Sequence, residues 1–290
     1  MIEIRNMSHA LGGKTVLHKI NLDIPDNTVL GIVGINGAGK STLLRLLSGV
    51  YLPDGGSILY DGKSPALPET KKDLFFLPDD PYYTATMTPI SLFEYYKVFH
   101  PKADRAVFDG LLDTYKIDLG GKMRNFSKGM RRQVFIALAL SIKPKYLLLD
   151  EAFDGLDPLS RKIFKDAIIS LVEEGNTTVL IASHSLRELE DFCDRFILID
   201  DNRIKTQGDI AEHVGCMCKF ELAFSEAVSE ELFASLPIVS LIIKNRFVNI
   251  VLEGKSEEMR GKLEALSPAV IDEMPLDFEE AFINDVRRRG

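Results

Sequence analysis

The feature that most constrains this chain is a glycine-rich segment between a predicted strand and a predicted helix. The apolar run 29–33 before it is typical of a strand buried on both faces of a sheet. The leucines of segment 43–47 after it recur with helical spacing. The strand, loop and helix predict an α/β fold with a parallel sheet. The segment fits the pattern of a phosphate-binding loop in every fixed position, and its residues are Gly34, Ile35, Asn36, Gly37, Ala38, Gly39, Lys40 and Ser41.

The residue types of this loop suit a nucleoside triphosphate. Glycines let successive backbone N–H groups turn toward phosphate oxygens, and the following helix adds the positive end of its dipole. We expect Lys40 to reach the β- and γ-phosphates as a catalytic cation, and the Ser41 hydroxyl to hold Mg²⁺. Thr42 follows directly and belongs to the same predicted site. The chain lacks the Asn-Lys-x-Asp element that reads guanine, so ATP is the predicted nucleotide.

Two adjacent carboxylates follow a second apolar strand, 146–149. Doubly wound sheets bind their ligands at the carboxyl ends of strands, which is where Asp150 and Glu151 stand. We expect Asp150 to hold the Mg²⁺ shell and Glu151 to orient or deprotonate the attacking water. Alone, the pair would be read as an acidic turn. Together with the phosphate loop it predicts a hydrolytic site.

The chain divides into a large domain, a helical insert within it, and a small terminal domain. Strands and helices alternate again after residue 146, which indicates a parallel sheet. Helical patterns replace strands over about 81–143, which predicts an inserted helical subdomain. Beyond residue 215 the order β-α-β-β-α-β is that of a ferredoxin-like unit. We therefore predict a nucleotide-binding domain over 1–212 and an accessory α+β domain over 216–290.

Composition and charge exclude several functions. A formal net charge of -8 and a pI near 5.3 argue against nucleic acid as a partner. No apolar run approaches the roughly 20 residues that cross a bilayer. The segment 2–5 alternates like a strand, unlike an export signal, so we expect a cytoplasmic protein. The cysteines, Cys193, Cys216 and Cys218, are few and odd in number, which favours reduced thiols.

Four further motifs follow the order and approximate spacing of ATP-binding cassette (ABC) ATPases, which the chain resembles over residues 1 to about 210. Segment 126–130 resembles the signature motif, 155–157 the D-loop, 183–184 the switch histidine and 76–79 the Q-loop. The amino-acid sequence of residues 36–42 is itself typical of this family. The resemblance implies a P-loop NTPase cassette, with a mainly parallel sheet, an antiparallel amino-terminal β subdomain and a helical insert.

The resemblance also implies a head-to-tail dimer, in which ATP lies between the phosphate loop of one cassette and the signature of the other. Ser127 and Gly129 would then offer a hydroxyl and backbone N–H groups to the γ-phosphate across the interface. Asp157 would lie at the dimer seam and join the two sites. His184 would contact the γ-phosphate and act with Glu151 on the attacking water.

Three positions depart from the family pattern. Asp79 stands where the Q-loop has glutamine and is expected to contact Mg²⁺, although neighbouring Asp80 leaves the alignment open. Lys128 replaces the first glycine of the signature and Met130 its glutamine, as in the branch that works with separately encoded exporter-type permeases. Leu11 takes the place of the adenine-stacking aromatic, so the base would rest on an aliphatic side chain and lose stacking energy.

The missing membrane span implies that another polypeptide, an integral-membrane permease, supplies the transport path. We expect an ATPase subunit that powers solute movement, with export favoured, on the inner face of the cell membrane. Tyr82 and Tyr83 are candidates for contacting the permease. Soluble relatives that act on ribosomes or chromosomes carry two cassettes or long coiled coils, which this chain lacks. The sequence leaves three questions open. It does not identify the solute, and it does not decide whether the dimer partner is a second copy of this chain or a paralogue. It also does not decide whether the accessory domain is a sensor, a clamp or a cap.

Overall fold

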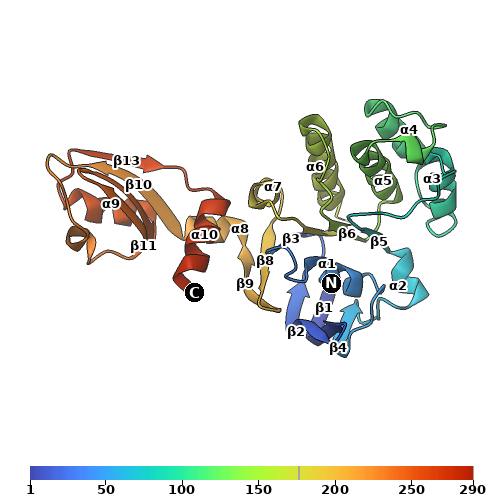
Figure 1. Cartoon of the computed structure of the whole chain (residues 1–290), viewed down its shortest axis with the longest axis horizontal. Coiled ribbons are helices and arrows are strands. Elements are labelled where there is room, and N and C mark those ends of the chain that lie inside the picture. Colours follow the sequence, from blue (N-terminus) through green and yellow to red (C-terminus); the bar gives the residue numbers. More distant parts are fainter. Residues whose placement is uncertain (176, 290) are drawn as a thin grey trace. The chain divides into compact units, whose positions relative to one another are not determined.

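The computed structural model describes residues 1–175 and 177–289, with side chains up to Asn284, and divides the chain into two compact units. Unit 1 comprises Met1–Ser185 and Phe192–Gln207 (Figure 1). Unit 2 comprises Leu186–Asp191 and the residues from Gly208 onward. The short segment Leu186–Asp191 therefore groups with the carboxy-terminal residues, although it lies inside the range 1–212 that the sequence assigns to one domain.

The main sheet of unit 1 has six strands in the order β5-β6-β7-β3-β8-β9, with parallel pairing from β5 through β8. Every residue of β3, β6 and β7 is buried, as expected for strands covered on both faces. Their carboxyl ends meet at one edge, where the phosphate loop, the two acidic residues and the switch histidine follow. The strands are β3 (Val29–Val33), β5 (Leu74–Leu77), β6 (Tyr146–Asp150), β7 (Thr178–Ala182), β8 (Arg195–Asp200) and β9 (Arg203–Asp209).

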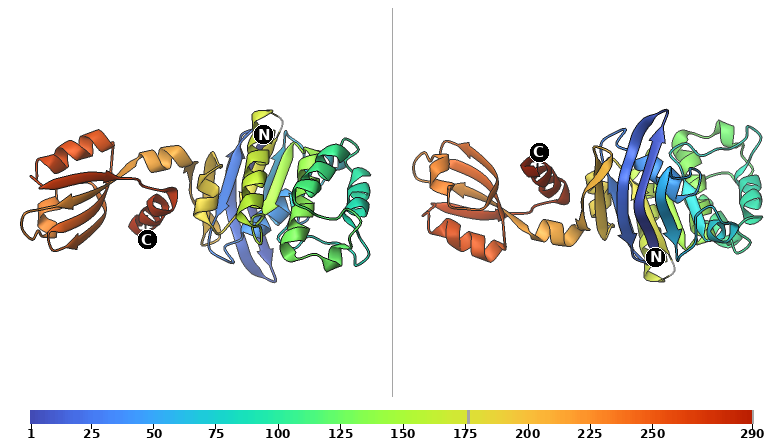
Figure 2. Two further views of the ribbon diagram at one scale, coloured as in Figure 1. Left: turned by 90° about the horizontal axis from the view of Figure 1, so that it is seen from above. Right: turned by 90° about the horizontal axis from the view of Figure 1, so that it is seen from below.

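A second sheet of unit 1 is antiparallel, in the order β2-β1-β4 (Figure 2). Its alternating apolar residues, such as Ile4, share one core with Leu44 of helix α1 and Leu148 of β6. This core fixes α1, and with it the phosphate loop, against both sheets. The predicted antiparallel amino-terminal subdomain is confirmed. Its elements are β1 (Ile2–Leu11), β2 (Lys14–Ile24), β4 (Gly55–Tyr60) and α1 (Lys40–Leu47).

Helices interrupt the sheet between β5 and β6. Thr88 and Ser91 form a capping box that starts α3, Asp104 caps α4, and the rings of Phe93 and Phe108 pack 5.0 Å apart between them. From Arg132 to its end, α5 is buried. The insert therefore has its own core and holds the signature segment at the start of α5. The helices of unit 1 are α2 (Pro68–Lys72), α3 (Pro89–Lys97), α4 (Arg105–Thr114), η1 (Met123–Asn125), α5 (Lys128–Ile142) and α6 (Pro158–Glu173).

Unit 2 contains an antiparallel sheet in the order β11-β12-β10-β13, which is the strand order of a ferredoxin-like unit. The first helix of the predicted β-α-β-β-α-β order is only a 3₁₀ turn, which ends before Pro237, whose ring disfavours helix in the preceding residue. Helix α10 packs against α7, α8 and β11. The elements are α7 (Leu186–Glu190), α8 (Ile210–Gly215), β10 (Met217–Ala223), η2 (Glu230–Phe233), β11 (Ile238–Lys244), β12 (Phe247–Glu253), α9 (Ser256–Glu264), β13 (Val270–Met274) and α10 (Phe278–Arg289).

Candidate functional site

The loop between β3 and α1 has the backbone of an anion cradle. Gly37 and Gly39 adopt φ values of 83° and 107°, in the left-handed region that side chains disfavour. A Cβ on Gly34 would lie 2.6 Å from the carbonyl oxygen of Ile199, so the loop can pack against β8 only with glycine there. Residues 35–37 are exposed at the tip. The loop therefore presents backbone N–H groups to a ligand, as a phosphate requires.

Lys40 folds back over its own loop. Its Nζ donates hydrogen bonds to the carbonyl oxygens of Gly34 at 2.6 Å and Ile35 at 3.4 Å. The same atom lies 3.9 Å from Oε1 of Glu151, and the lysine side chain is only 6% exposed. A desolvated cation beside the glycine-rich loop fits the charge of a triphosphate.

Ser41 and Asp150 meet across the edge of the sheet. The Ser41 hydroxyl, in the first turn of α1, donates to Oδ1 of Asp150 at 3.0 Å. Asp150 ends β6 and is 1% exposed. Burial raises the pKa of this carboxyl, and the hydrogen bond from Ser41 opposes the rise. A hydroxyl and a carboxylate are oxygen ligands of the kind that Mg²⁺ prefers, so these residues fit that ion.

Glu151 and His184 form the second contact at this edge. Oε2 of Glu151 lies 2.9 Å from Nδ1 of His184. The same oxygen accepts a hydrogen bond from the backbone N–H of His184 at 3.3 Å. Glu151 has φ of 48°, an uncommon conformation for a non-glycine residue, and such strain costs on the order of 1–3 kcal/mol and gathers at functional sites. Its N–H donates to the Ala182 carbonyl at 2.9 Å. Polar atoms of Asp154, which the sequence did not single out, lie within 4.8 Å of both side chains.

The signature residues make their contacts elsewhere. Ser127 caps α5, and its hydroxyl accepts a hydrogen bond from Met130 N–H at 3.1 Å. A Cβ on Gly129 would lie 2.5 Å from the carbonyl oxygen of Gly155. The signature therefore packs against the D-loop of the same chain, and glycine is the residue that this approach permits.

Asp157 joins the D-loop to the signature helix. Its carboxylate caps α6 and accepts hydrogen bonds from the Ser160 backbone at 3.0 Å and hydroxyl at 2.6 Å, which lower the pKa of Asp157. Gln133 of α5 donates to the same Ser160 hydroxyl at 2.7 Å. The sequence did not identify Gln133 or Ser160, because neither belongs to a motif.

Asp79 is directed at the signature helix. Its Oδ1 lies 2.7 Å from an Nη of Arg132 and 3.5 Å from Nζ of Lys128. Arg132, 2% exposed, also donates to the Pro78 carbonyl at 3.0 Å. Sequence reasoning missed Arg132, because it stands between Arg131 and Gln133, before the apolar run of α5, and reads as a solvated residue. Asp79 and Lys128, which both depart from the family pattern, are thus in contact with each other. A Mg²⁺ contact of Asp79 stays a prediction.

Side chains of β2 approach the phosphate loop, since a Cβ on Gly39 would lie 3.0 Å from Cδ2 of Leu17. Leu11 ends β1 and is 40% exposed. Val16 of β2 approaches the loop itself, since a Cβ on Gly39 would lie 3.2 Å from its Cγ1. Val16 escaped notice because it reads as an ordinary strand residue. A contact of Leu11 with the base stays a prediction.

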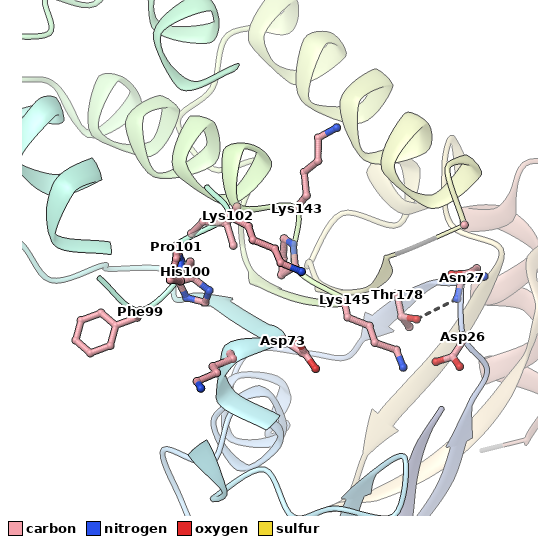
Figure 3. A pocket seen from close by; sticks show the side chains of 14 residues that line it. Asp26, Asn27, Asp73, Phe99, His100, Pro101, Lys102, Lys143, Lys145 and Thr178 are labelled. Carbon is pink, nitrogen blue, oxygen red and sulfur yellow. Dashed lines mark hydrogen bonds between the residues drawn. The ribbon is translucent and has the colours of Figure 1, made fainter. Parts of the chain in front are cut away.

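A cavity of about 690 Å³ lies at the opposite edge of the main sheet (Figure 3). Its lining includes Asn27, Lys145 and Thr178, which stand at the amino ends of β3, β6 and β7. Asn27 N–H donates to the Thr178 hydroxyl at 3.0 Å across its wall. The motif residues lie at the carboxyl ends, so this cavity is separate from the candidate site.

Known proteins share this sequence pattern. The family model described as ABC transporter matches residues 17–154. ABC transporter ATP-binding protein YtrB of Bacillus subtilis (strain 168) is 31% identical over 285 residues, 98% of this chain and 97% of the relative. Lantibiotic transport ATP-binding protein SrtF of Streptococcus pyogenes is 31% identical over 208 residues, 70% of this chain and 89% of the relative. Methionine import ATP-binding protein MetN of Clostridium tetani is 31% identical over 227 residues, 73% of this chain and 70% of the relative.

Solved structures share the fold. An ATP-binding subunit of an ABC transporter superposes with a TM-score of 0.68 at 24% identity, over 73% of this chain and 91% of its own. A dimeric post-hydrolysis structure of the ATP-binding cassette MJ0796, bound to ADP and Pi, superposes with a TM-score of 0.63 at 21% identity. The match covers 72% of this chain and 98% of the MJ0796 chain. The predicted cassette fold is confirmed. This chain belongs to the family of ABC transporter ATP-binding proteins, which are ATPases.

Proposed function

We propose that this chain powers export of a solute through a separate integral-membrane permease, and that it hydrolyses ATP in a head-to-tail dimer. One observation carries the proposal: the residues for phosphate, Mg²⁺ and water chemistry contact one another within one chain, whereas the signature residues contact their own helix and the D-loop. The first set, here called the cradle half, is Lys40, Ser41, Asp150, Glu151 and His184. The second set, the signature half, is Ser127, Gly129 and Asp157.

The signature half has the chemistry of a second anion site. Ser127 is exposed at the start of a 15-residue helix, where unpaired N–H groups and the helix dipole favour negative charge. Its hydroxyl hydrogen is free to donate, since the oxygen acts as acceptor for Met130 N–H. In a twofold dimer each signature half would complete the cradle half of the other chain. The MJ0796 cassette, which shares the fold, forms a dimer.

The cradle half suits direct hydrolysis. When bound at Ser41 and Asp150, Mg²⁺ would neutralise charge on the phosphate oxygens. Lys40 exchanges the carbonyl oxygen of Gly34 for oxygens of the β- and γ-phosphates. A water oxygen bonds to the γ-phosphorus, the bond to the oxygen shared with the β-phosphate breaks, and ADP leaves. Glu151 takes the water's proton, and His184 holds that carboxylate and the water in line.

A permease partner is supported by the surface of the helical insert. Within the described residues, no helix is both long and apolar enough to cross a membrane. Tyr82 beside the Q-loop is 82% exposed, a large ring available to a partner, while Tyr83 packs 5.4 Å from the Arg131 guanidinium. Relatives are named for lantibiotic transport and for methionine import, so export rests on Lys128 and Met130 in the signature. The dimer would lie on the inner face of the cell membrane.

The test is Glu151→Gln, which keeps the shape of the side chain and removes the base. We expect turnover to fall about 100-fold or more, with ATP affinity retained and an ATP-dependent dimer visible by light scattering. Glu173→Gln, at the exposed end of α6, is the matched control and should behave like the original chain. Retained turnover in Glu151→Gln refutes the base, and a monomer at saturating ATP refutes the dimer.

A further inference from the structure

Helix α7 links the switch histidine to unit 2. It begins at Leu186, two residues after His184, yet Leu186–Asp191 belongs to unit 2. The chain therefore leaves unit 1 after Ser185 and returns to it at Phe192. Because the backbone is continuous, a shift or rotation of α7 acts directly on the residue that contacts Glu151.

Helix α10 holds α7 by three kinds of contact. Glu190, the last residue of α7, accepts a hydrogen bond from the Phe278 backbone N–H at 2.9 Å, at the start of α10. Nε of Arg187 donates to Oε2 of Glu279 at 2.8 Å. Leu189 and Phe278 are both 0% exposed, so apolar burial supports the polar contacts. The orientation of α7 is thus set from the far end of the sequence.

The same helix is anchored to the sheet of unit 2. Lys219 of β10 donates from Nζ to Oε2 of Glu280 at 2.9 Å, and the ring of His213 in α8 packs edge-on to Phe278 with centroids 6.0 Å apart. Neighbouring carboxylates of α10 therefore have different partners. Glu279 binds α7, and Glu280 binds the sheet.

We propose that α10 is a positioning element for the switch histidine, in which Phe278 and Glu279 set α7 and thereby the placement of His184 against Glu151. This inference rests on the proposed function, because His184 matters only where γ-phosphate is hydrolysed. It gives unit 2 a defined role: the contacts that α10 makes with α7 act on the hydrolytic pair. Lys40 and the phosphate loop lie outside this path, so ATP affinity is independent of it.

The adjacent carboxylates provide a matched experiment on the full chain. Glu279→Lys places a cation against Arg187, and Glu280→Lys places one against Lys219. We expect Glu279→Lys to lower kcat about two- to fivefold, the factor of an exposed ion pair, with unchanged KM. Glu280→Lys should stay within about twofold of the original kcat. The double variant Arg187→Glu with Glu279→Lys restores the pair in reverse and should restore kcat.

The original chain and Glu151→Gln are measured first, so that failure of the proposed function is seen there and is distinct from failure of this inference. A purely structural role for α10 would make both lysine variants lose kcat equally, and the reversed pair would rescue nothing. Equal losses, an unchanged kcat in Glu279→Lys, or a change confined to KM each overturn the proposal. Selective loss with rescue supports it.

Discussion

The cradle half and the signature half of the candidate site are held together in different ways. The cradle half is linked by direct side-chain contacts between residues far apart in sequence, as in Ser41 with Asp150 and Glu151 with His184. The signature half consists of helix caps and a close backbone approach, as in Ser127 with Met130 and Gly129 with Gly155. One half is therefore assembled within a single chain, and in the proposed dimer the other would present groups to a second molecule.

The fold explains this difference. Parallel strands deliver their following loops to one edge of the sheet, so β3, β6 and β7 bring the cradle half together. The signature half starts α5, a helix of the insert, and reaches the D-loop of its own chain. Variants in the two halves should consequently differ in kind: loss of the phosphate-binding cation Lys40 in the cradle half removes ATP binding, whereas variants in the signature half spare it.

The largest expected effect is that of Lys40→Ala in the cradle half. Removing a cation that is 6% exposed leaves the phosphates without their charged partner, so ATP affinity should fall about 100-fold or more. Isothermal titration with Mg²⁺ and ATP measures this change. Lys143→Ala, an exposed lysine after α5, is the control and should titrate like the original chain. Unchanged affinity in Lys40→Ala would contradict the cradle.

The next effect belongs to the signature half. In Gly129→Ala the added Cβ would lie 2.5 Å from the Gly155 carbonyl, so the D-loop and the signature must move apart. We expect ATP affinity to stay within about twofold and turnover to fall about 100-fold, the cost of misplacing one preorganised donor to the γ-phosphate. If Gly129→Ala lost as much ATP affinity as Lys40→Ala, the division of the site into two functionally different halves would be wrong.

Mixing these two inactive variants tests the division directly. In a dimer of Lys40→Ala with Gly129→Ala, one composite site has both defects and the other has none. Random pairing makes about half of the dimers mixed, with one sound site of two, so about a quarter of the original turnover should return. Absence of recovery, in a mixture shown to exchange subunits, would rule out a site shared between two copies.

Sequence reasoning predicts the cradle half well, because its residues are contiguous in the loop or stand at strand ends that a parallel sheet must bring together. Contacts without a local pattern lie beyond it. Arg132 meets Asp79 across 53 residues, and nothing near either position specifies the pairing. Leu186–Asp191 groups with unit 2, and its Arg187 contacts Glu279 across 92 residues of sequence. Tertiary packing decides such contacts, so the structure was needed to find them.

A moderate effect is expected from Asp150→Asn, which separates stability from function in the cradle half. Burial raises the pKa of Asp150, so the folded chain binds that proton more tightly than the unfolded chain and the charged form destabilises the fold. The asparagine variant should melt higher at neutral pH without nucleotide, by about 2–4 °C per kcal/mol of relief, while Mg²⁺-dependent turnover is lost. The gain should shrink as pH falls and vanish below about 3.9, where both side chains are neutral. A lower melting temperature in the variant at neutral pH would contradict the burial penalty.

The smallest expected effect concerns the contact between the end of β5 and the signature helix. Asp79 and Lys128 are both about half exposed and lie 3.5 Å apart, so their coupling should be about 0.2–1 kcal/mol. A double-mutant cycle with Asp79→Asn and Lys128→Ala, read in kcat/KM, measures that coupling. Asp79→Asn alone should cost more than Lys128→Ala alone, because it also removes the carboxylate that lies 2.7 Å from buried Arg132. Zero coupling would mean that the ion pair between Asp79 and Lys128 contributes nothing to kcat/KM. If Asp79→Asn instead raised the Mg²⁺ concentration needed for half-maximal turnover, the carboxylate would belong to the cradle half, as the sequence predicts.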